Sequence, residues 1–191
     1  MRVARAAPLL AAGLCLLGAG CEGGPGSARI FKVDAGAMEP TLQVGERVAV
    51  TSDSSTPHVD EIVVFHPPEG SAEQRCGRQP AKGEMCSQPA ARKQAGVNIV
   101  SRIVAGPGDE IYMTDGHLFR KAAGHGSFVR ELDPYIRPCG QGGSSPCSFP
   151  KPITVPAGHW FMVGDNRGES DDSRFWGPVP TSWLVGQVQL F

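Results

Sequence analysis

Short apolar runs, many of them alternating with polar residues, recur along this chain of 191 residues. The alternation is regular between residues 97 and 104, where it places Ser101 on the same face as Ile99 and Ile103. The 25 glycines and 17 prolines break long helices. We therefore expect a mainly β fold built on an antiparallel sheet. The expected strands cover residues 29–33, 44–50, 60–65, 97–104, 111–113, 117–119, 153–163 and 183–191.

Two stretches interrupt the strand pattern. Residues 69–96 are rich in Gly, Pro, Gln and charge without a sustained period, and we expect them to form an insertion. Residues 122–152 are rich in loop-forming residues, which predicts a small accessory lobe. Asp115-Gly116 between two short apolar runs is typical of a β-hairpin. The chain length suits one domain, so residues 29–191 are expected to fold around a common core.

The N-terminus has the character of an export signal. Arg2 and Arg5 precede an uncharged run, residues 6–20, that is short for a membrane span, and Cys21 follows. Residues 17–21 resemble a bacterial lipobox, in which the cysteine becomes the lipidated first residue. We expect residues 1–21 to be a signal peptide with a lipobox, and residues 22–28 to be a flexible tether. An uncleaved anchor and a simple secreted form are the alternatives. All three place the domain on the outer face of the cytoplasmic membrane.

Four further cysteines agree with an oxidising compartment. The short sequence separations favour the disulfides Cys76–Cys86 and Cys139–Cys147 among the three possible pairings. Zinc is the competing interpretation, but neither pair has the spacing of a zinc knuckle.

The net charge limits the classes of partner that we expect. A formal net charge of −1 offers no broad attraction to nucleic acid. No His or Cys joins the C-terminal carboxylates at ligand spacing, so we expect neither a metal nor a cofactor.

Three segments carry a family resemblance, and they follow one another in a fixed order. Residues 33–42 read Val-Asp-Ala-Gly-Ala-Met-Glu-Pro-Thr-Leu, and residues 101–109 read Ser-Arg-Ile-Val-Ala-Gly-Pro-Gly-Asp. Residues 164–180 read Gly-Asp-Asn-Arg-Gly-Glu-Ser-Asp-Asp-Ser-Arg-Phe-Trp-Gly-Pro-Val-Pro. They resemble the nucleophile box, the general-base box and the C-terminal box of type I signal peptidases. The resemblance spans residues 31–191 and implies a signal-peptidase-like β-sheet domain that acts on signal peptides of exported proteins.

The resemblance also implies what chemistry is missing. In this family a Ser attacks the peptide carbonyl, and a Lys kept neutral by burial takes up its proton. Ala37 and Ser101 stand at the two matching positions. Ala35 stands where many members have a Ser that helps to bind the oxyanion. Ser170 and Asp172 match supporting positions, for which a purely structural role in the turn competes with a catalytic one.

Ser101 has a second interpretation. It would be the nucleophile of an unrecognised site if folding brought a histidine base within hydrogen-bond reach. The alternative is that it is a small polar residue that fills the space of a lost Lys. The candidate bases are His58, His66, His117, His125 and His159.

In the family, the segment after the nucleophile lies along an apolar groove in which an extended signal peptide docks by strand addition. Met38, Pro40 and Leu42 are therefore predicted to contact peptide. Three hypotheses follow from the sequence. The chain is a catalytically inactive protein that holds signal peptides or other extended peptides, an active signal peptidase, or a structural lipoprotein with a decayed groove.

Overall fold

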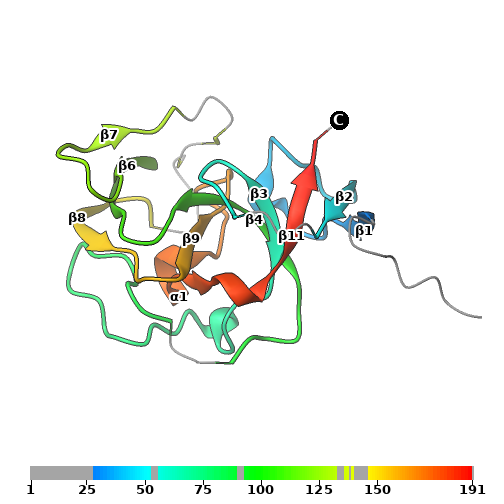
Figure 1. Ribbon diagram of the computed structural model, residues 1–191, viewed down its shortest axis with the longest axis horizontal. Coiled ribbons are helices and arrows are strands. Elements are labelled where there is room, and N and C mark those ends of the chain that lie inside the picture. Colours follow the sequence, from blue (N-terminus) through cyan, green and yellow to red (C-terminus); the bar gives the residue numbers. More distant parts are fainter. Residues whose placement is uncertain are drawn as a thin grey trace, which may run out of the picture.

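We describe a computed structural model of the chain, in which residues 28–52, 56–89, 93–132, 136–137, 139 and 146–190 are placed (Figure 1). The predicted signal peptide, the candidate lipidation residue Cys21 and the tether up to residue 27 lie outside these residues. Within the placed residues, no helix is long and apolar enough to cross a membrane.

The placed residues form a mainly β structure, as the sequence predicts. The strands are β1 (Ala28–Lys32), β2 (Arg47–Thr51), β3 (Ile62–Phe65), β4 (Ile99–Ala105), β5 (Glu110–Thr114), β6 (His117–Lys121), β7 (Val129–Arg130), β8 (Phe149–Thr154), β9 (His159–Val163), β10 (Val179–Pro180) and β11 (Leu184–Gln189). The helical elements are short: η1 (Gly36–Met38), η2 (Ser71–Glu73), α1 (Ser173–Trp176) and η3 (Thr181–Trp183).

The strands pair in antiparallel fashion in two sheets. The larger sheet has the order β1-β2-β11-β3-β4-β9-β10, and the smaller has the order β7-β6-β5-β8. Figure 1 shows β6, β7 and β8 at one end of the molecule and β1 and β2 at the other. The smaller sheet spans residues 110–154, so it begins before residue 122, where the sequence pattern placed the start of the lobe.

The β5–β6 hairpin explains why local sequence predicted this part well. Asp115 and Gly116 both have positive φ, 51° and 81°, which is the backbone that a two-residue hairpin turn requires. Gly pays no steric cost there, and Asp tolerates it better than most residues.

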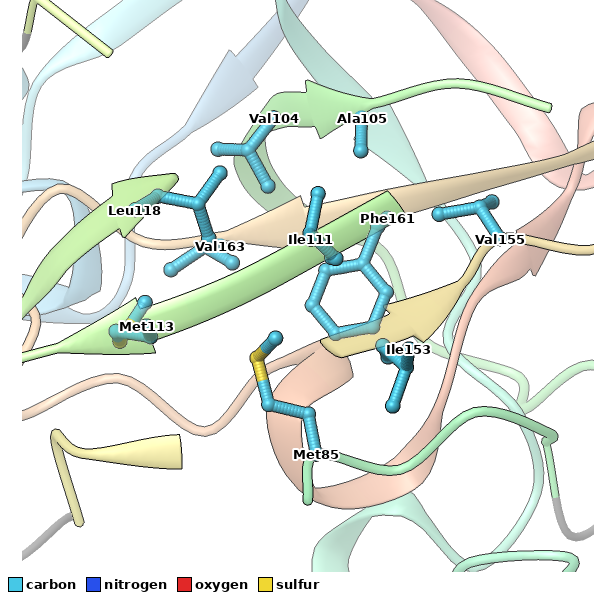
Figure 2. Close-up of a cluster of buried hydrophobic side chains, with 10 residues drawn as sticks. All are labelled: Met85, Val104, Ala105, Ile111, Met113, Leu118, Ile153, Val155, Phe161 and Val163. Atoms are coloured by element: carbon cyan, nitrogen blue, oxygen red, sulfur yellow. The ribbon is translucent and has the colours of Figure 1, made fainter. Parts of the chain in front are cut away.

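One core lies between the two sheets. Figure 2 shows the cluster, in which side chains of β4 and β9 meet those of β5, β6 and β8. Its members are Met85, Val104, Ala105, Ile111, Met113, Leu118, Ile153, Val155, Phe161 and Val163. The smaller sheet covers β4 on this face, and on its other face β4 contributes Ile103 to a second cluster. The residues of β4 from Ser101 to Ala105 are therefore all buried.

The segment between β3 and β4 is anchored to the rest of the fold around Met85 and Cys86. Met85 is fully buried in the core, and the backbone N–H of Cys86 donates to the Arg174 carbonyl oxygen at 2.8 Å. Cys86 is bonded to Cys76, with 5.7 Å between their Cα atoms. Cys139 is likewise bonded to Cys147. Both predicted disulfides are therefore confirmed, and the cysteines are not zinc ligands.

Candidate functional site

An apolar groove of about 440 Å³ runs along the larger sheet, and three of the positions singled out by the sequence meet in it. Ala35, Ala37 and Ser101 all line this groove. The rest of the lining comes from β1 to β4, from η2 and from the C-terminal box: Phe31, Lys32, Val33, Asp34, Val48, Val64, Pro67, Ser71, Ala72, Val97, Asn98, Ile99, Val100, Glu169, Asp171 and Trp176.

The turn that presents Ala37 is fixed by buried residues on either side of it. Val33 and Met38 belong to the core cluster beneath the larger sheet. The Val33 backbone N–H donates to the Glu46 carbonyl oxygen at 2.8 Å. With its neighbours held in this way, Ala37 remains half-buried and faces the groove.

Met38 and Leu42 do not lie where the sequence placed them. Both are fully buried in that core cluster, with no exposed surface to offer a peptide. Pro40 is exposed but is not part of the groove lining. The apolar residues of this box therefore support the turn from below, and the groove surface comes from the strands beside it.

The C-terminal box holds the Ala37 turn from the other side. The Asn166 backbone N–H donates to the Ala37 carbonyl oxygen at 2.9 Å, and its side-chain amide donates to the Gly36 carbonyl oxygen at 3.0 Å. A Cβ atom on Gly164 would overlap both the Ala37 carbonyl oxygen and the Ser170 hydroxyl. Only glycine permits this close approach.

Ser101 reaches the same place from β4. It pairs with Val63 of β3 and is 3% exposed. Arg102, the next residue, pairs with Val163 of β9, the residue before Gly164. Ser170 packs against Gly164 beside the Ala37 carbonyl, and Ser101 lines the same groove as Ala37. The family positions in this region are occupied by Ala37, Ser101 and Ser170. Their side chains are a methyl and two hydroxyls, with no amine among them.

A buried ion pair ties the three sequence boxes together. Arg102 donates to Asp165 through two nitrogens, with Nε–Oδ1 at 2.9 Å and Nη2–Oδ2 at 2.7 Å. Asp165 is fully buried, and it also accepts from the Thr41 hydroxyl. Arg102 further donates to the Asp60 carbonyl oxygen at 2.7 Å. Fork-shaped pairing of this kind satisfies both charges and fixes the geometry.

Asp172 has a structural role in the same box. Its side chain caps α1 by accepting from the Arg174 backbone N–H at 3.1 Å. It also pairs with the Arg174 side chain, at 2.8 Å from Nε and 2.9 Å from Nη2. Both side chains are fully buried. Asp172 is therefore bound by Arg174, whereas Arg102 binds Asp165.

The family model "Signal peptidase, peptidase S26" matches residues 26–191. The chain belongs to this family. It is 31% identical over 154 residues to thylakoidal processing peptidase 1 of Arabidopsis thaliana, covering 78% of this chain and 37% of the relative. It is 28% identical over 155 residues to the probable signal peptidase I-1 of Synechocystis, covering 79% of this chain and 64% of that one. The chain thus spans less than two thirds of the length of these relatives.

Among solved structures, a signal peptidase I from Enterococcus faecalis is 20% identical. The TM-score is 0.42, with 71% of this chain and 98% of that chain covered.

None of the five histidines lies among the groove-lining residues of this signal-peptidase-family chain. His66 comes nearest in sequence, and its Nδ1 lies 2.9 Å from the Val97 carbonyl oxygen. His117 contacts Arg130, while His125 and His159 bond to nearby backbone carbonyls. The placed residues therefore bring no imidazole base to Ser101.

Asp171 is a groove-lining residue with an altered pKa. Burial raises its pKa to about 6, and the neighbouring Asp172 carboxylate adds to the rise. Arg174 and a hydrogen bond from Gln74 act in the opposite direction. No feature of the sequence singled out Asp171, although it lies between Ser170 and Asp172, the two supporting residues of the C-terminal box.

The residues that form the groove walls were not predicted either. The one related signal in the sequence is that some of them fall in predicted strands. Phe31, Val48 and Val64 fall in predicted strands, but the pattern gives no indication of which strand face is left uncovered. Ser71 and Ala72 come from the insertion, whose place in space depends on long-range contacts.

Proposed function

We propose that this chain is a signal-peptidase-like protein on the outer face of the cytoplasmic membrane that holds extended peptides, including signal peptides of exported proteins, without cutting them. A single observation carries the proposal. Ala37 and Ser101, the positions matching the family nucleophile and base, line one open apolar groove with a methyl and a hydroxyl.

The backbone around the groove suits an extended peptide. β9 pairs with β4 from Arg102 onward, so within the placed residues Ile99–Ser101 has a strand neighbour on the β3 side alone. Ala35 continues from β1 in extended conformation, with φ −141° and ψ 154°. Peptides bind such edges by main-chain hydrogen bonds, and the apolar pockets alongside take alternate side chains.

The same groove lacks what hydrolysis requires. A methyl group has no lone pair with which to attack a carbonyl, and a serine hydroxyl is not a base at neutral pH. Loss of the nucleophile from a serine protease costs about 10⁶-fold in rate. Ala35 brings no hydroxyl to an oxyanion, which leaves backbone N–H groups as donors.

Two observations argue against the competing hypotheses. The absence of a histidine among the groove-lining residues argues against Ser101 as the nucleophile of a Ser–His site. A groove of about 440 Å³ argues against decay, because it is large enough for several small side chains.

A cleavage assay tests the lack of activity. Purified protein is incubated with a fluorogenic signal-peptide substrate, beside the variants Ser101→Ala and Ala37→Ser/Ser101→Lys. We expect the wild type and Ser101→Ala to match the blank. The double variant should gain cleavage at the usual junction, because burial lowers the pKa of a lysine at position 101. Cleavage by the wild type that disappears in Ser101→Ala would establish an active enzyme.

Calorimetry with the same peptide, made without a fluorophore, tests binding. The proposal requires saturable binding by the wild type. A bulky Ala72→Trp substitution in the groove wall should weaken it, whereas Ala123→Trp, outside the groove lining, should not. No binding under conditions where the protein is folded would favour a structural lipoprotein.

A further inference from the structure

The charges that line the groove are not balanced. Among the described lining residues, Lys32 is the only cation, and it faces Asp34 with 3.3 Å between Nζ and Oδ1. Asp171 adds a further carboxylate on the side of the C-terminal box. An apolar groove whose charged lining is mainly acidic favours a ligand that is apolar and carries a positive charge.

Asp171 has no cation of its own within the placed part of the chain. Its nearest arginine, Arg174, is already bound to Asp172 through two nitrogens. Arg174 also donates to the carbonyl oxygens of Pro146, Arg167 and Ser170. The other side chain that lowers the pKa of Asp171 is the neutral amide of Gln74. One carboxylate on the groove wall is therefore left for an incoming partner.

Asp171 is also well placed to read a bound peptide. It follows Ser170, which packs against Gly164 next to the Ala37 carbonyl. Its pKa responds to the side chain of Gln74, which follows η2, and Ser71 and Ala72 of η2 line the same groove. A peptide lying along β4 past Ser101 would pass between these walls.

We propose that the groove selects extended apolar peptides that carry a lysine or arginine at the position facing Asp171. This inference rests on the proposed peptide binding and specifies the class of peptide. The charge pair sets the register of the peptide, while the apolar walls and the β4 edge supply most of the affinity.

The test uses eight-residue alanine- and valine-rich peptides with an N-terminal fluorophore, in which one lysine is moved along the sequence. Each peptide is compared by fluorescence anisotropy with its glutamine counterpart at pH 7.5 and low salt. We expect one lysine position to bind about two- to fivefold tighter than glutamine, the range of a partly exposed ion pair. That preference should disappear with Asp171→Asn, which keeps the shape of the side chain and an acceptor for Gln74.

Asp115→Asn is the matched control, because it makes the same charge change in the β5–β6 turn, where Asn tolerates the positive φ of 51°. This control should keep the lysine preference. A charge swap is the second arm: Asp171→Lys should prefer a glutamate peptide at the same position. A further readout is pH, since protonation of Asp171 below about pH 6 should remove the preference.

The outcomes are distinct. Peptide binding with no preference for lysine at any position, or a preference that persists in Asp171→Asn, would overturn this inference and leave the proposed function intact. Failure of every peptide, the glutamine series included, to bind the folded wild type would overturn both.

Discussion

Two parts of the candidate site lie side by side, and they differ in how completely their groups are paired. Arg102–Asp165 and Arg174–Asp172 are buried, bidentate and fully partnered. The neighbouring Ala37 and Ser101 line an open groove, and no side chain in the placed residues hydrogen-bonds to the Ser101 hydroxyl. The ion pairs hold the turn and the strands in position, whereas the side chains of Ala37 and Ser101 hold no other described side chain in place.

This difference separates the frame of a catalytic site from its chemistry. A buried charge left without its partner costs several kcal/mol. Substitution of one residue of either ion pair would therefore destabilise the fold. Replacing Ser by Ala or Lys by Ser in a groove leaves no buried charge behind. The chain can therefore lose hydrolysis and keep the groove.

The largest effect should come from breaking the frame. Arg102→Met removes the partner of Asp165, which is fully buried. An uncompensated buried carboxylate costs about 3–5 kcal/mol, and we expect a loss of this size in the free energy of urea unfolding. Arg47→Met is the control, because Arg47 is exposed on β2 and should change stability by less than about 0.5 kcal/mol. Equal effects of the two variants would show that the ion pair does not support the frame.

The next effect concerns the glycine on which the two parts meet. Gly164→Ala would force its Cβ into the Ala37 carbonyl and the Ser170 hydroxyl. Overpacking of this kind costs about 1–3 kcal/mol, and here it should also displace the turn that lines the groove. Thermal unfolding measures the first effect and peptide binding the second. Gly126→Ala, with open space around its Cβ, should leave both unchanged.

The sequence could predict the parts of this molecule that depend on local pattern. The Asp115-Gly116 hairpin follows from backbone preferences, and β4 follows from its alternation. Both disulfides were predicted from short separations, which limit the alternatives. Convergence of residues 37 and 101 on one groove rested on the order of the three boxes and on the family resemblance.

Other features required the folded chain. In the sequence, Met38 and Leu42 are spaced like residues that contact a peptide. Whether these two side chains are buried depends on which side of the turn the core lies. Arg102 and Asp165 are separated by 63 positions, and no local signal pairs them. The start of the smaller sheet was missed because β5 and β6 look like any hairpin until β8 pairs beside them.

Glu131, which follows β7 of the smaller sheet, is a carboxylate whose ion pair does not offset the effect of burial on its pKa. Burial raises the pKa of Glu131 to about 7, with Asp60 adding to the rise, although Arg120 lies 3.3 Å away. The folded pKa is above the unfolded value, so the stabilising contribution is complete below about pH 4.5 and is lost as pH rises through about 7. Glu131→Gln should therefore gain about 1–2 kcal/mol relative to wild type at pH 8 and nothing at pH 4. Chemical denaturation at several pH values measures this, and a pH-independent difference would contradict it.

The smallest effect should come from Ser101 itself. Ser101→Ala removes a hydroxyl that bonds to no other side chain in the placed residues, and it keeps the Cβ that lines the groove. We expect a stability change within about 0.5 kcal/mol and unchanged peptide affinity. Equilibrium unfolding and calorimetry test both expectations. A loss above about 1 kcal/mol would mean that the hydroxyl belongs to the frame, and the contrast between paired frame and vacated groove would then need to be drawn elsewhere. No measurable loss would place the boundary between them at Arg102, one residue along the same strand.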